Sequence, residues 1–492
     1  MIRLFVALAA AAFGLALGAP AAHASAPVYT VKACPANWPA QTARVVECGT
    51  LTVDETRGDP NTRRIDIAVA TVKASDPWHD ASGRTLPPVV VFHGGPGGAL
   101  VQGVGRRLAF YAANPDRAGP LAAVDQDWIY FDQRGGGLDN PSMDCPGAQL
   151  TDAGPPSKED ADKLIACMKG WADAGVNLSQ YNAAVIAADV ADLKTAMKLD
   201  RIDLFGGSYG PRIEAAVITH APQGVRAVVM DSPWPPEGNW AVHTPEQVST
   251  AVKIILAKCA AQTDCNARHP DLQTRFEANA RLWLAGPQTW TNGPGKDGKS
   301  YTVEDLASFL MDTTYSGSGV RSLPSDLEKI IAGDLSPVAG AAESRTYYTE
   351  GQHMAHLCKE ELPFESKERL AAGAAGDPVA EVSVPSLSRL FDVCATVDVG
   401  PADPVENAPV HTTIPTLFIA AEIDPGCPPP LTRKAAEGYK DSQVMIVTNA
   451  THGVTGGSPC AARAARDFLR DPTRPVDQSC LPAAGTPLVF TE

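Results

Sequence analysis

Two apolar runs that end in glycines constrain the fold of this chain more than any other feature of its sequence. They are PPVVVFHGG at 87–95 and DWIYFDQRGGG at 127–137. A strand with one face in water alternates apolar and polar residues, whereas a central strand of a parallel sheet is buried on both faces and is apolar throughout. Both runs are therefore predicted to be buried central strands of a parallel sheet.

Helical patterns alternate with strand-like runs through the first half of the chain. Strands are predicted at 64–74, 201–205 and 224–236, and apolar residues recur at helical spacing over 182–199 and 210–222. Successive strand–helix–strand units imply right-handed crossovers. The sequence therefore predicts an α/β fold with a doubly wound sheet.

The pattern changes between about residues 237 and 405, where helical stretches dominate and loops are rich in Gly, Pro and Ser. Alternation returns with strands predicted at 414–425 and 442–453 and helices at 429–439 and 459–472. A chain that leaves a sheet and returns to it is most simply a core with an inserted, mainly helical cap. The predicted division is a signal peptide at 1–24, a first part of the core at 25–236, the cap at 237–405 and a second part of the core at 406–492.

The first residues have the layout of a secretory signal peptide. Arg3 precedes an apolar run from about 4 to 18, and small residues follow around 22–24. A membrane anchor would need about 20 apolar residues, and this run is shorter. We predict cleavage after Ala24 or Ala26, which leaves an exported chain, secreted or in the periplasm or cell envelope, without a membrane span.

The eleven cysteines belong, after export, in an oxidising compartment. Their spacing suggests local pairs and leaves Cys427 over, although spacing does not fix connectivity. Cys-x-x-Cys motifs do not occur in the double form that indicates structural zinc. The suggested pairs are Cys34 with Cys48, Cys145 with Cys167, Cys259 with Cys265, Cys358 with Cys394, and Cys460 with Cys480.

The charge of the chain bears on its partners. A formal net charge of −15 argues against nucleic acid, because phosphate binding requires basic patches. It equally disfavours an acidic membrane surface. With 44% hydrophobic residues, the composition is that of a globular protein rather than a disordered one.

Ser208 stands in the pattern Gly-x-Ser-x-Gly, in GGSYG at 206–210. The predicted strand ends at Phe205 and the predicted helix begins near Pro211. In such a strand–turn–helix unit, small residues permit the strained turn that exposes a nucleophilic serine. The helix N-terminus adds partial positive charge where an oxyanion would form. The competing interpretation is a plain glycine-rich loop.

A serine nucleophile needs a base, and the base needs an orienting acid. On this kind of scaffold the chain order is nucleophile, acid, base. His452 follows the last predicted strand and Asp424 follows the strand before it, so both lie at the carboxyl-end edge that carries Ser208. Glu422 is the alternative acid, but its position within the strand would point it away from the loop.

The stretch HGGPGGAL at 93–100 follows a buried strand. Its glycines allow backbone N–H groups to approach a ligand, as an oxyanion hole requires. We predict the N–H groups of Gly95 and Tyr209 as the two donors. A dinucleotide-binding loop is disfavoured because the expected unit with an acid about 20 residues on does not follow. His93 is interpreted as structural.

Five motifs together resemble a known family. The prolyl iminopeptidase family of α/β hydrolases has similar motifs, and the secreted tripeptidyl aminopeptidases of actinobacteria and related exported hydrolases are more closely similar. The resemblance implies the α/β-hydrolase fold, with a doubly wound, mostly parallel sheet, and a Ser208–His452–Asp424 triad. The motifs are HGGPGG at 93–98, DQRGGG at 132–137, GGSYG at 206–210, EIDP at 422–425 and THG at 451–453.

The resemblance covers about residues 40–240 and 405–480, and the cap is only loosely similar. It implies that Asp132 and Arg134 support the loop beneath the site rather than take part in catalysis. Two positions depart from prolyl iminopeptidases: Tyr209 replaces their usual tryptophan, as in the tripeptidyl group, and Cys427 stands three residues after the acid in DPGCPP.

An exopeptidase must bind a protonated α-amine, and a carboxylate does so most simply. The candidates are Glu360 and Glu361 in the cap, with Glu214 and Glu237 as further choices. Glu360 is favoured because a disulfide at Cys358 would fix its backbone. A solvated acidic helix face is the competing interpretation.

His353 and His356 lie at helical spacing before Glu360 and form a possible metal face. A serine mechanism needs no metal, so we expect neither a metal nor a cofactor. The leading hypothesis is a secreted serine exopeptidase acting on peptides with a free N-terminus. An exported esterase or amidase with the same triad is the alternative, and a non-catalytic binding protein on a hydrolase scaffold is the third.

Overall fold

The computed structural model describes most of the chain. The described residues are 25–38, 44–80, 82–114, 125–343, 348–483 and 485–491. The predicted signal peptide at 1–24 lies outside them. Within these ranges, none of the helices has the length and apolar character needed to cross a bilayer.

The described residues build one central sheet of nine strands and a separate small hairpin. The order across the sheet is β1-β2-β3-β5-β4-β6-β7-β10-β11. The pairs among β1, β2, β3 and β5 are antiparallel, and all the others are parallel. The strands are β1 (Val28–Lys32), β2 (Val46–Asp54), β3 (Arg64–Val72), β4 (Val89–Phe92), β5 (Trp128–Phe131), β6 (Ile202–Gly207), β7 (Val225–Asp231), β10 (Thr416–Ala421) and β11 (Ser442–Val447).

The two apolar runs at 87–95 and 127–137 are confirmed as central strands. Every residue of β4 and β5 is buried, as strands covered on both faces require. Both strands are shorter than predicted, because the glycine-rich ends of the two runs leave the sheet as loops at its carboxyl edge. Those loops contribute to the site described below.

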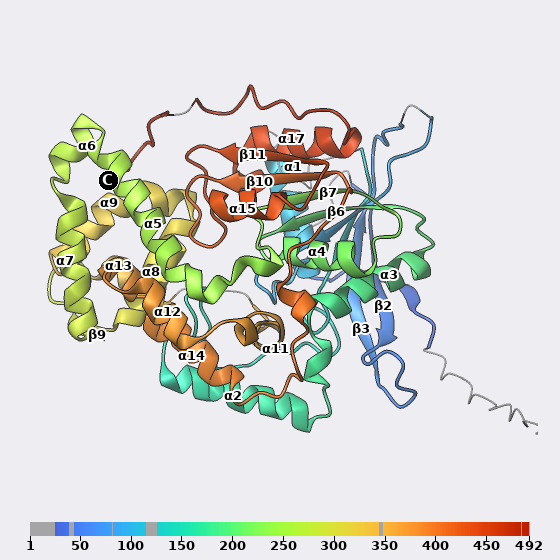
Figure 1. Ribbon diagram of the computed structural model, residues 1–492, viewed down its shortest axis with the longest axis horizontal. Coiled ribbons are helices and arrows are strands. Elements are labelled where there is room, and N and C mark those ends of the chain that lie inside the picture. The colour runs from blue at the N-terminus through green and yellow to red at the C-terminus, as the bar shows by residue number, and fades with distance from the viewer. Residues whose placement is uncertain are drawn as a thin grey trace, which may run out of the picture.

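Helices cover both faces of the sheet (Figure 1). Alternate residues of β4 point into different cores: Val90 packs with α3 and α4, and Val89 and Val91 pack with α1 and α17. The predicted helices around 182–199, 210–222 and 459–472 are therefore confirmed as layers of the α/β core. The helices of these two layers are α1 (Val104–Ala113), α3 (Ala183–Met197), α4 (Gly210–His220) and α17 (Pro459–Arg470), and α15 (Pro429–Ala436) packs on β10 and β11.

Between β7 and β10 the chain forms a mainly helical body with its own core (Figure 1). One core helix outside this segment, α2 (Lys158–Asp173), packs beneath α11 and α14. The small hairpin pairs β8 (Gln288–Thr289) with β9 (Ser300–Tyr301). The helices are α5 (Trp240–Ala260), α6 (Thr263–Arg268), α7 (Leu272–Ala285), α8 (Val303–Tyr315), α9 (Gly317–Ile331), α10 (Ser336–Glu343), α11 (Glu350–Glu360), α12 (Lys367–Ala374), α13 (Pro378–Glu381) and α14 (Val384–Cys394).

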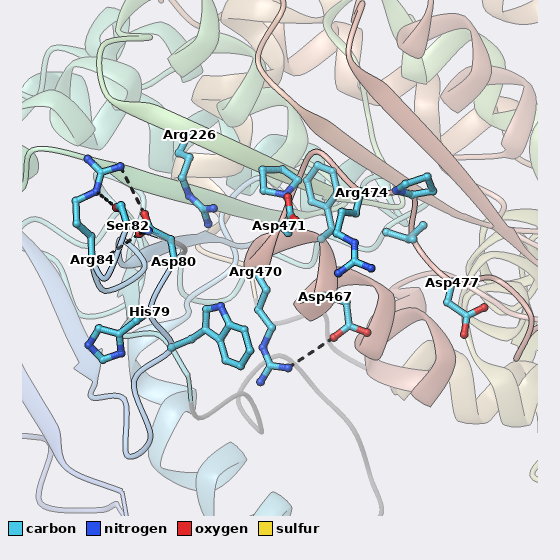
Figure 2. Close-up of a pocket in the computed structure, with 15 residues that line it drawn as sticks. His79, Asp80, Ser82, Arg84, Arg226, Asp467, Arg470, Asp471, Arg474 and Asp477 are labelled. Carbon is cyan, nitrogen blue, oxygen red and sulfur yellow. Dashed lines mark hydrogen bonds and ion pairs between the residues drawn. The ribbon is translucent and has the colours of Figure 1, made fainter.

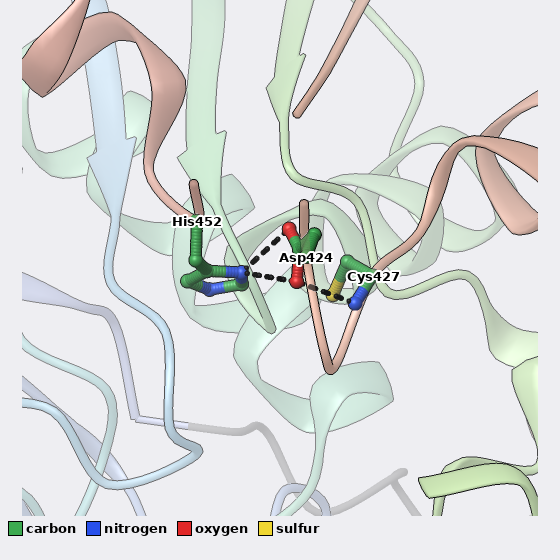
Figure 3. A group of neighbouring side chains, drawn as sticks. All are labelled: Asp424, Cys427 and His452. Carbon is green, nitrogen blue, oxygen red and sulfur yellow. Dashed lines mark hydrogen bonds and ion pairs between the residues drawn. The ribbon is translucent and has the colours of Figure 1, made fainter. Parts of the chain in front are cut away.

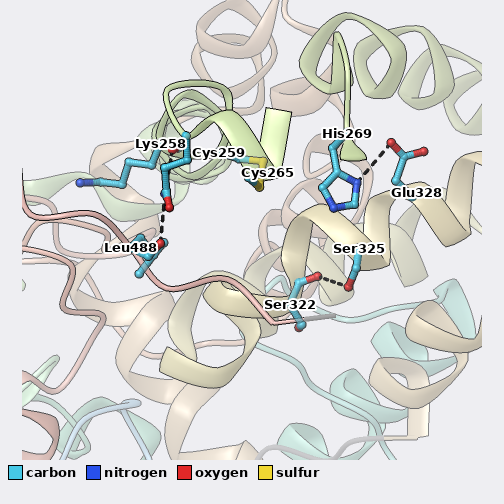
Figure 4. Close-up of a disulfide and its surroundings, with 9 residues drawn as sticks. Lys258, Cys259, Cys265, His269, Ser322, Ser325, Glu328 and Leu488 are labelled. Atoms are coloured by element: carbon cyan, nitrogen blue, oxygen red, sulfur yellow. Dashed lines mark hydrogen bonds and ion pairs between the residues drawn. A yellow bond between two sulfur atoms is a disulfide. The ribbon is translucent and has the colours of Figure 1, made fainter. Parts of the chain in front are cut away.

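All five suggested cysteine pairs are joined as disulfides, and Cys427 is free and buried. Cys259–Cys265 links the end of α5 to α6 (Figure 4). The Cys358–Cys394 bridge links α11 to α14 and spans 36 residues. Leu488 lies next to the α5–α6 bridge (Figure 4). Its carbonyl accepts the side-chain amide of Gln262, which anchors the C-terminal segment on the cap.

Removing the longer bridge should destabilise the protein more than removing the shorter one. Replacing Cys358 and Cys394 by alanine should cost about 2–4 kcal/mol of unfolding free energy. The control pair, Cys259 and Cys265, closes a loop of 6 residues and should cost less, because a shorter loop restricts the unfolded chain less. Urea denaturation of both double variants tests this, and an equal or reversed order would contradict it.

Candidate active site

Ser208 sits on a sharp turn between β6 and α4. Its φ is 63°, in the left-handed region that residues with a side chain rarely adopt. The backbone is crowded here: a Cβ on Gly94 would lie 2.6 Å from the Ser208 Cβ, and one on Gly210 would lie 2.8 Å from the Phe92 carbonyl oxygen. A Cβ on Gly206 would lie 2.7 Å from the Gly210 carbonyl carbon. Close packing at Gly206 and Gly210 therefore explains the two glycines of the Gly-x-Ser-x-Gly pattern, and Gly94, outside the pattern, lets the loop after β4 approach Ser208.

Asp424 and His452 form a hydrogen-bonded pair (Figure 3). The His452 Nδ1 atom lies 2.9 Å from Asp424 Oδ2 and 3.1 Å from Oδ1. Asp424 Oδ1 also accepts the backbone N–H groups of Gly426 and Cys427, at 3.0 and 2.9 Å. Asp424 follows β10 and His452 follows β11, so parallel neighbouring strands bring them together at their carboxyl ends.

The pair shifts the pKa values of both groups. Burial acts to raise the pKa of Asp424, but the adjacent His452 and the two backbone N–H donors outweigh it and hold that pKa below its ordinary value. Burial acts to lower the pKa of His452, but the charge of Asp424 outweighs it and raises that pKa. The carboxylate therefore stays ionised and orients the imidazole.

Ser208 and His452 line the same cavity, and in the described part of the chain no hydrogen bond joins them. All three residues of the predicted triad thus lie at one edge of the sheet. The alternative acid, Glu422, lies elsewhere: it accepts the backbone N–H of Asn449 at 2.8 Å and pairs with Lys258 at 3.0 Å. The Glu422 side chain therefore points toward other partners, whereas Asp424 points toward His452.

The predicted oxyanion donors are adjacent to Ser208. Gly95 lines its cavity with a φ of 117°, which a residue with a Cβ would adopt only under strain. Tyr209 caps the N-terminus of α4, where backbone N–H groups lack helical partners. Among the described residues neither N–H group has a hydrogen-bond acceptor. Both donors are therefore available to a ligand.

Asp132 and Arg134 lie behind the site and do not line its cavities. Asp132 accepts the backbone N–H groups of Leu100 and Val101, at 2.7 and 3.0 Å, and so fixes the loop after β4. Burial raises the pKa of Asp132 to about 6, although these hydrogen bonds act to lower it. Arg134 is fully buried and forms two bonds of 2.7 Å with Asp189 on α3.

Glu360 and Glu361 are not where a substrate amine would contact them, which corrects the expectation from the sequence. They are 2% and 1% exposed and line neither cavity of Ser208. Glu360 accepts the Tyr209 hydroxyl and the backbone N–H of Ala183. Glu361 pairs with Arg212 at 2.5 Å. Both carboxylates serve to hold the cap on α4.

The proposed metal face on α11 has other partners. His353 Nδ1 lies 2.7 Å from the Pro96 carbonyl, and His356 Nδ1 lies 2.5 Å from the Tyr209 hydroxyl. Among the described residues, the one group whose ligand atoms converge is Asp424, Cys427 and His452 (Figure 3). Burial and the charge of Asp424 raise the pKa of Cys427, which keeps it a thiol rather than the thiolate that binds metals.

A cavity of about 220 Å³ opens beside Ser208 and contains a carboxylate that the sequence analysis missed. Asp152 accepts the Tyr348 hydroxyl at 2.5 Å. Burial raises its pKa, and burial with the charge of Asp152 raises the pKa of nearby Asp312 to about 7. Asp152 lies in a loop without a motif, so no signal in the sequence could have found it. The lining residues are Gly95, Asp152, Ser208, Trp234, Trp240, Tyr315, Tyr348, His353, Cys427 and His452.

A second cavity, of about 350 Å³, opens on another side of Ser208. His93 lines it, and burial together with the charge of Arg107 lowers the pKa of that histidine to about 4. The ring is therefore neutral, and its Nδ1 lies 3.1 Å from the Gly94 carbonyl. This position fits the structural role expected for His93.

A larger hollow of about 930 Å³ lies at the opposite edge of the sheet (Figure 2). It is lined by residues before β4, at the start of β7, and at the end of α17 and after it. Three of its arginines have acidic partners: Arg84 pairs with Asp80, Arg226 with Asp203 and Arg470 with Asp125. None of the residues discussed above lines it.

The strand order, the serine turn and the acid–base pair at the carboxyl edge define the class of protein. The chain has the α/β-hydrolase fold and is a hydrolase of that fold. The part that carries Asp424 and His452, residues 381–480, matches the α/β-hydrolase family described as TAP-like protein.

Comparison with other proteins gave two further findings. The search of curated proteins gave no match. Among solved structures, an esterase from Thermogutta terrifontis with malate bound is 16% identical with a TM-score of 0.34, over 88% of this chain and 100% of that one. A proline iminopeptidase from Mycobacterium smegmatis is 15% identical with a TM-score of 0.36, over 83% and 96%.

The pH dependence of hydrolysis should reflect the Asp424–His452 pair. The base acts only when neutral, and Asp424 raises its pKa, so kcat/KM on a chromogenic ester should fall with decreasing pH through a pKa above the ordinary 6.5. Asp424→Asn should move this acidic limb to lower pH and reduce kcat about 10⁴-fold. Glu422→Gln is the matched control and should leave the limb in place. The opposite result would make Glu422 the orienting acid.

Proposed function

We propose that this protein is an exported serine exopeptidase that removes short segments from the N-termini of peptides. Ser208 is the nucleophile, His452 the base and Asp424 the orienting acid. Export is supported by the layout of the first residues and by five disulfides in the described chain, which are typical of oxidising compartments.

The proposed reaction uses the groups gathered around Ser208. Ser208 Oγ attacks the scissile carbonyl carbon while His452 Nε2 takes its proton. The oxyanion accepts the N–H groups of Gly95 and Tyr209. His452 then donates the proton to the leaving amine as the C–N bond breaks and the acyl-enzyme forms. Water, deprotonated by His452, attacks the ester carbonyl and releases the N-terminal fragment together with free Ser208.

The observation that carries the peptidase assignment is the Asp152 carboxylate in the cavity beside Ser208. A substrate ammonium would pair with it, and the added positive charge would lower its raised pKa and favour the ionised form. The cavity volume of about 220 Å³ lies below the ~300–1,000 Å³ of common small-molecule sites. The acyl part of the substrate must therefore be short.

An exported esterase or amidase is the second candidate. The aromatic walls of the same cavity, Trp234, Trp240 and Tyr315, could take an apolar acyl group without using Asp152. The two functions share the triad and differ in whether a free amine is required.

Ser208→Ala should abolish turnover under either function. We expect a loss of at least about 10³-fold in kcat, because the other nucleophilic side chain close to His452, Cys427, is held as a buried thiol by its raised pKa. Reaction of the wild-type protein with a fluorophosphonate, followed by peptide mapping, should label Ser208, and the variant should remain unlabelled. Labelling elsewhere, or near wild-type turnover by the purified variant, would contradict the assignment.

Blocking the substrate amine should separate the two functions. N-acetylated peptides should be cleaved far more slowly than free ones, as measured by mass spectrometry. Asp152→Asn should lower kcat/KM on free peptides about 10–100-fold, which corresponds to the loss of one hydrogen bond between charged groups. The variant should have little effect on a simple acyl ester. Asp144→Asn, on the surface of the same loop region, is the control. Equal cleavage of free and acetylated peptides would favour the esterase.

A further inference from the structure

Ser208 lies where the two cavities meet. Gly95, Ser208, Tyr348 and His452 belong to the linings of both. A substrate whose carbonyl is attacked by Ser208 therefore extends its acyl part into one cavity and its leaving part into the other. With the acyl part beside Asp152, the leaving part lies in the second cavity, whose volume is about 350 Å³.

The second cavity contains a guanidinium without an anionic partner. Arg107, on α1, lines it, and among the described residues Arg107 forms no ion pair or hydrogen bond. Its charge still acts on the site, since it lowers the pKa of His93 and opposes the raised pKa of Asp132. Asp132 forms no ion pair with Arg107 in the described structure, and both of its carboxylate oxygens accept backbone N–H groups.

A second donor in this cavity is also unpaired. Tyr130, on β5, lines the cavity and is 2% exposed, and its hydroxyl has no hydrogen-bond partner in the described chain. Burial raises its pKa, so the hydroxyl remains a neutral donor. The Arg44 guanidinium, whose charge also acts on Tyr130, donates to the Lys73 carbonyl. An unpaired buried hydroxyl is costly unless a ligand satisfies it.

The other polar groups of the cavity are neutral or satisfied. His93 is uncharged, as described above. The Asp231 carboxylate accepts the backbone N–H groups of Val454 and Thr455 and the Thr455 hydroxyl, at 2.9, 2.8 and 2.7 Å. Apolar side chains, including Leu100 and Phe205, form much of the remaining wall. Among the described residues, the cavity therefore holds one unpaired cation, Arg107, and one unpaired donor, Tyr130, whereas the one carboxylate among its lining residues, Asp231, already accepts three hydrogen bonds.

We infer that Arg107 and Tyr130 bind the free C-terminal carboxylate of the leaving fragment, so that this enzyme prefers short peptides cleaved one or two residues from their C-terminus. The inference rests on the proposed exopeptidase function. A carboxylate accepts from a guanidinium and a hydroxyl at once. The leaving fragment must fit within about 350 Å³ for its carboxylate to contact Arg107, which limits its length.

Matched peptides with a free or an amidated C-terminus test the inference. On wild-type protein, the free acid of a short peptide should have a kcat/KM about 10–100-fold higher than its amide. Lengthening the leaving fragment to four or more residues should remove this preference, because the carboxylate then lies outside the cavity. This comparison uses the intact protein and depends on no variant.

Variants assign the preference to the two donors. Arg107→Gln should reduce the ratio of kcat/KM for the free acid to kcat/KM for the amide to about one. Tyr130→Phe should reduce the preference partly. Arg106→Gln, an exposed neighbour on α1, is the matched control and should keep the full preference. In all variants, circular dichroism and the rate on the amidated peptide report folding.

The outcomes distinguish a failure of the proposed peptidase function from a failure of the carboxylate site. If no peptide with a free N-terminus is cleaved while esters are, the proposed peptidase function is wrong. If free peptides are cleaved but acids and amides at equal rates, the carboxylate site is wrong and the peptidase function stands. A preference that survives Arg107→Gln would also overturn the assignment to Arg107.

Discussion

The close approach of β4, β6 and α4 at the serine turn is the constraint on which the rest of the site depends. Ser208 keeps a left-handed backbone only because Gly94 and Gly210 allow neighbouring backbone and side-chain atoms within distances that a Cβ would forbid. The same contact brings the loop after β4, with Gly95, next to the N-terminus of α4. Ser208 and the backbone N–H groups of Gly95 and Tyr209 are thus positioned by one packing arrangement.

Buried charge then fixes the cap against this turn. Arg212, on α4, is 2% exposed and pairs with Glu361, while the Tyr209 hydroxyl contacts Glu360 and His356. Buried charges are costly unless fully paired and hydrogen-bonded. The cap residues that satisfy Arg212 therefore hold the first turn of α4, next to Tyr209 and Ser208. A change in cap position would be transmitted directly to the serine turn.

Local patterns predicted most of the core and three of the central site residues. The spacing of apolar residues and the alternation of strands with helices identified β4, β5, β6, β7 and β10. A strand buried on both faces is apolar throughout, and this can be read from its own residues without knowing its neighbours. The disulfides followed from short spacings, which limit the possible partners. Strand ends located Ser208, Asp424 and His452 at one edge, since all parallel strands of a sheet end there in the same direction.

Residues whose role depends on distant partners could not be predicted. Glu360 and Glu361 looked available in the sequence, and only the fold places Arg212, about 150 positions earlier, against them. Asp152, Arg107 and Tyr130 belong to no motif, because a cavity is lined by whichever loops and helices meet there. Periodicity along single segments was enough to predict the α/β core and the strand ends at which Ser208, Asp424 and His452 lie. The folded chain was needed to see which charges are paired and which face the cavities, because pairing between remote residues is a property of packing.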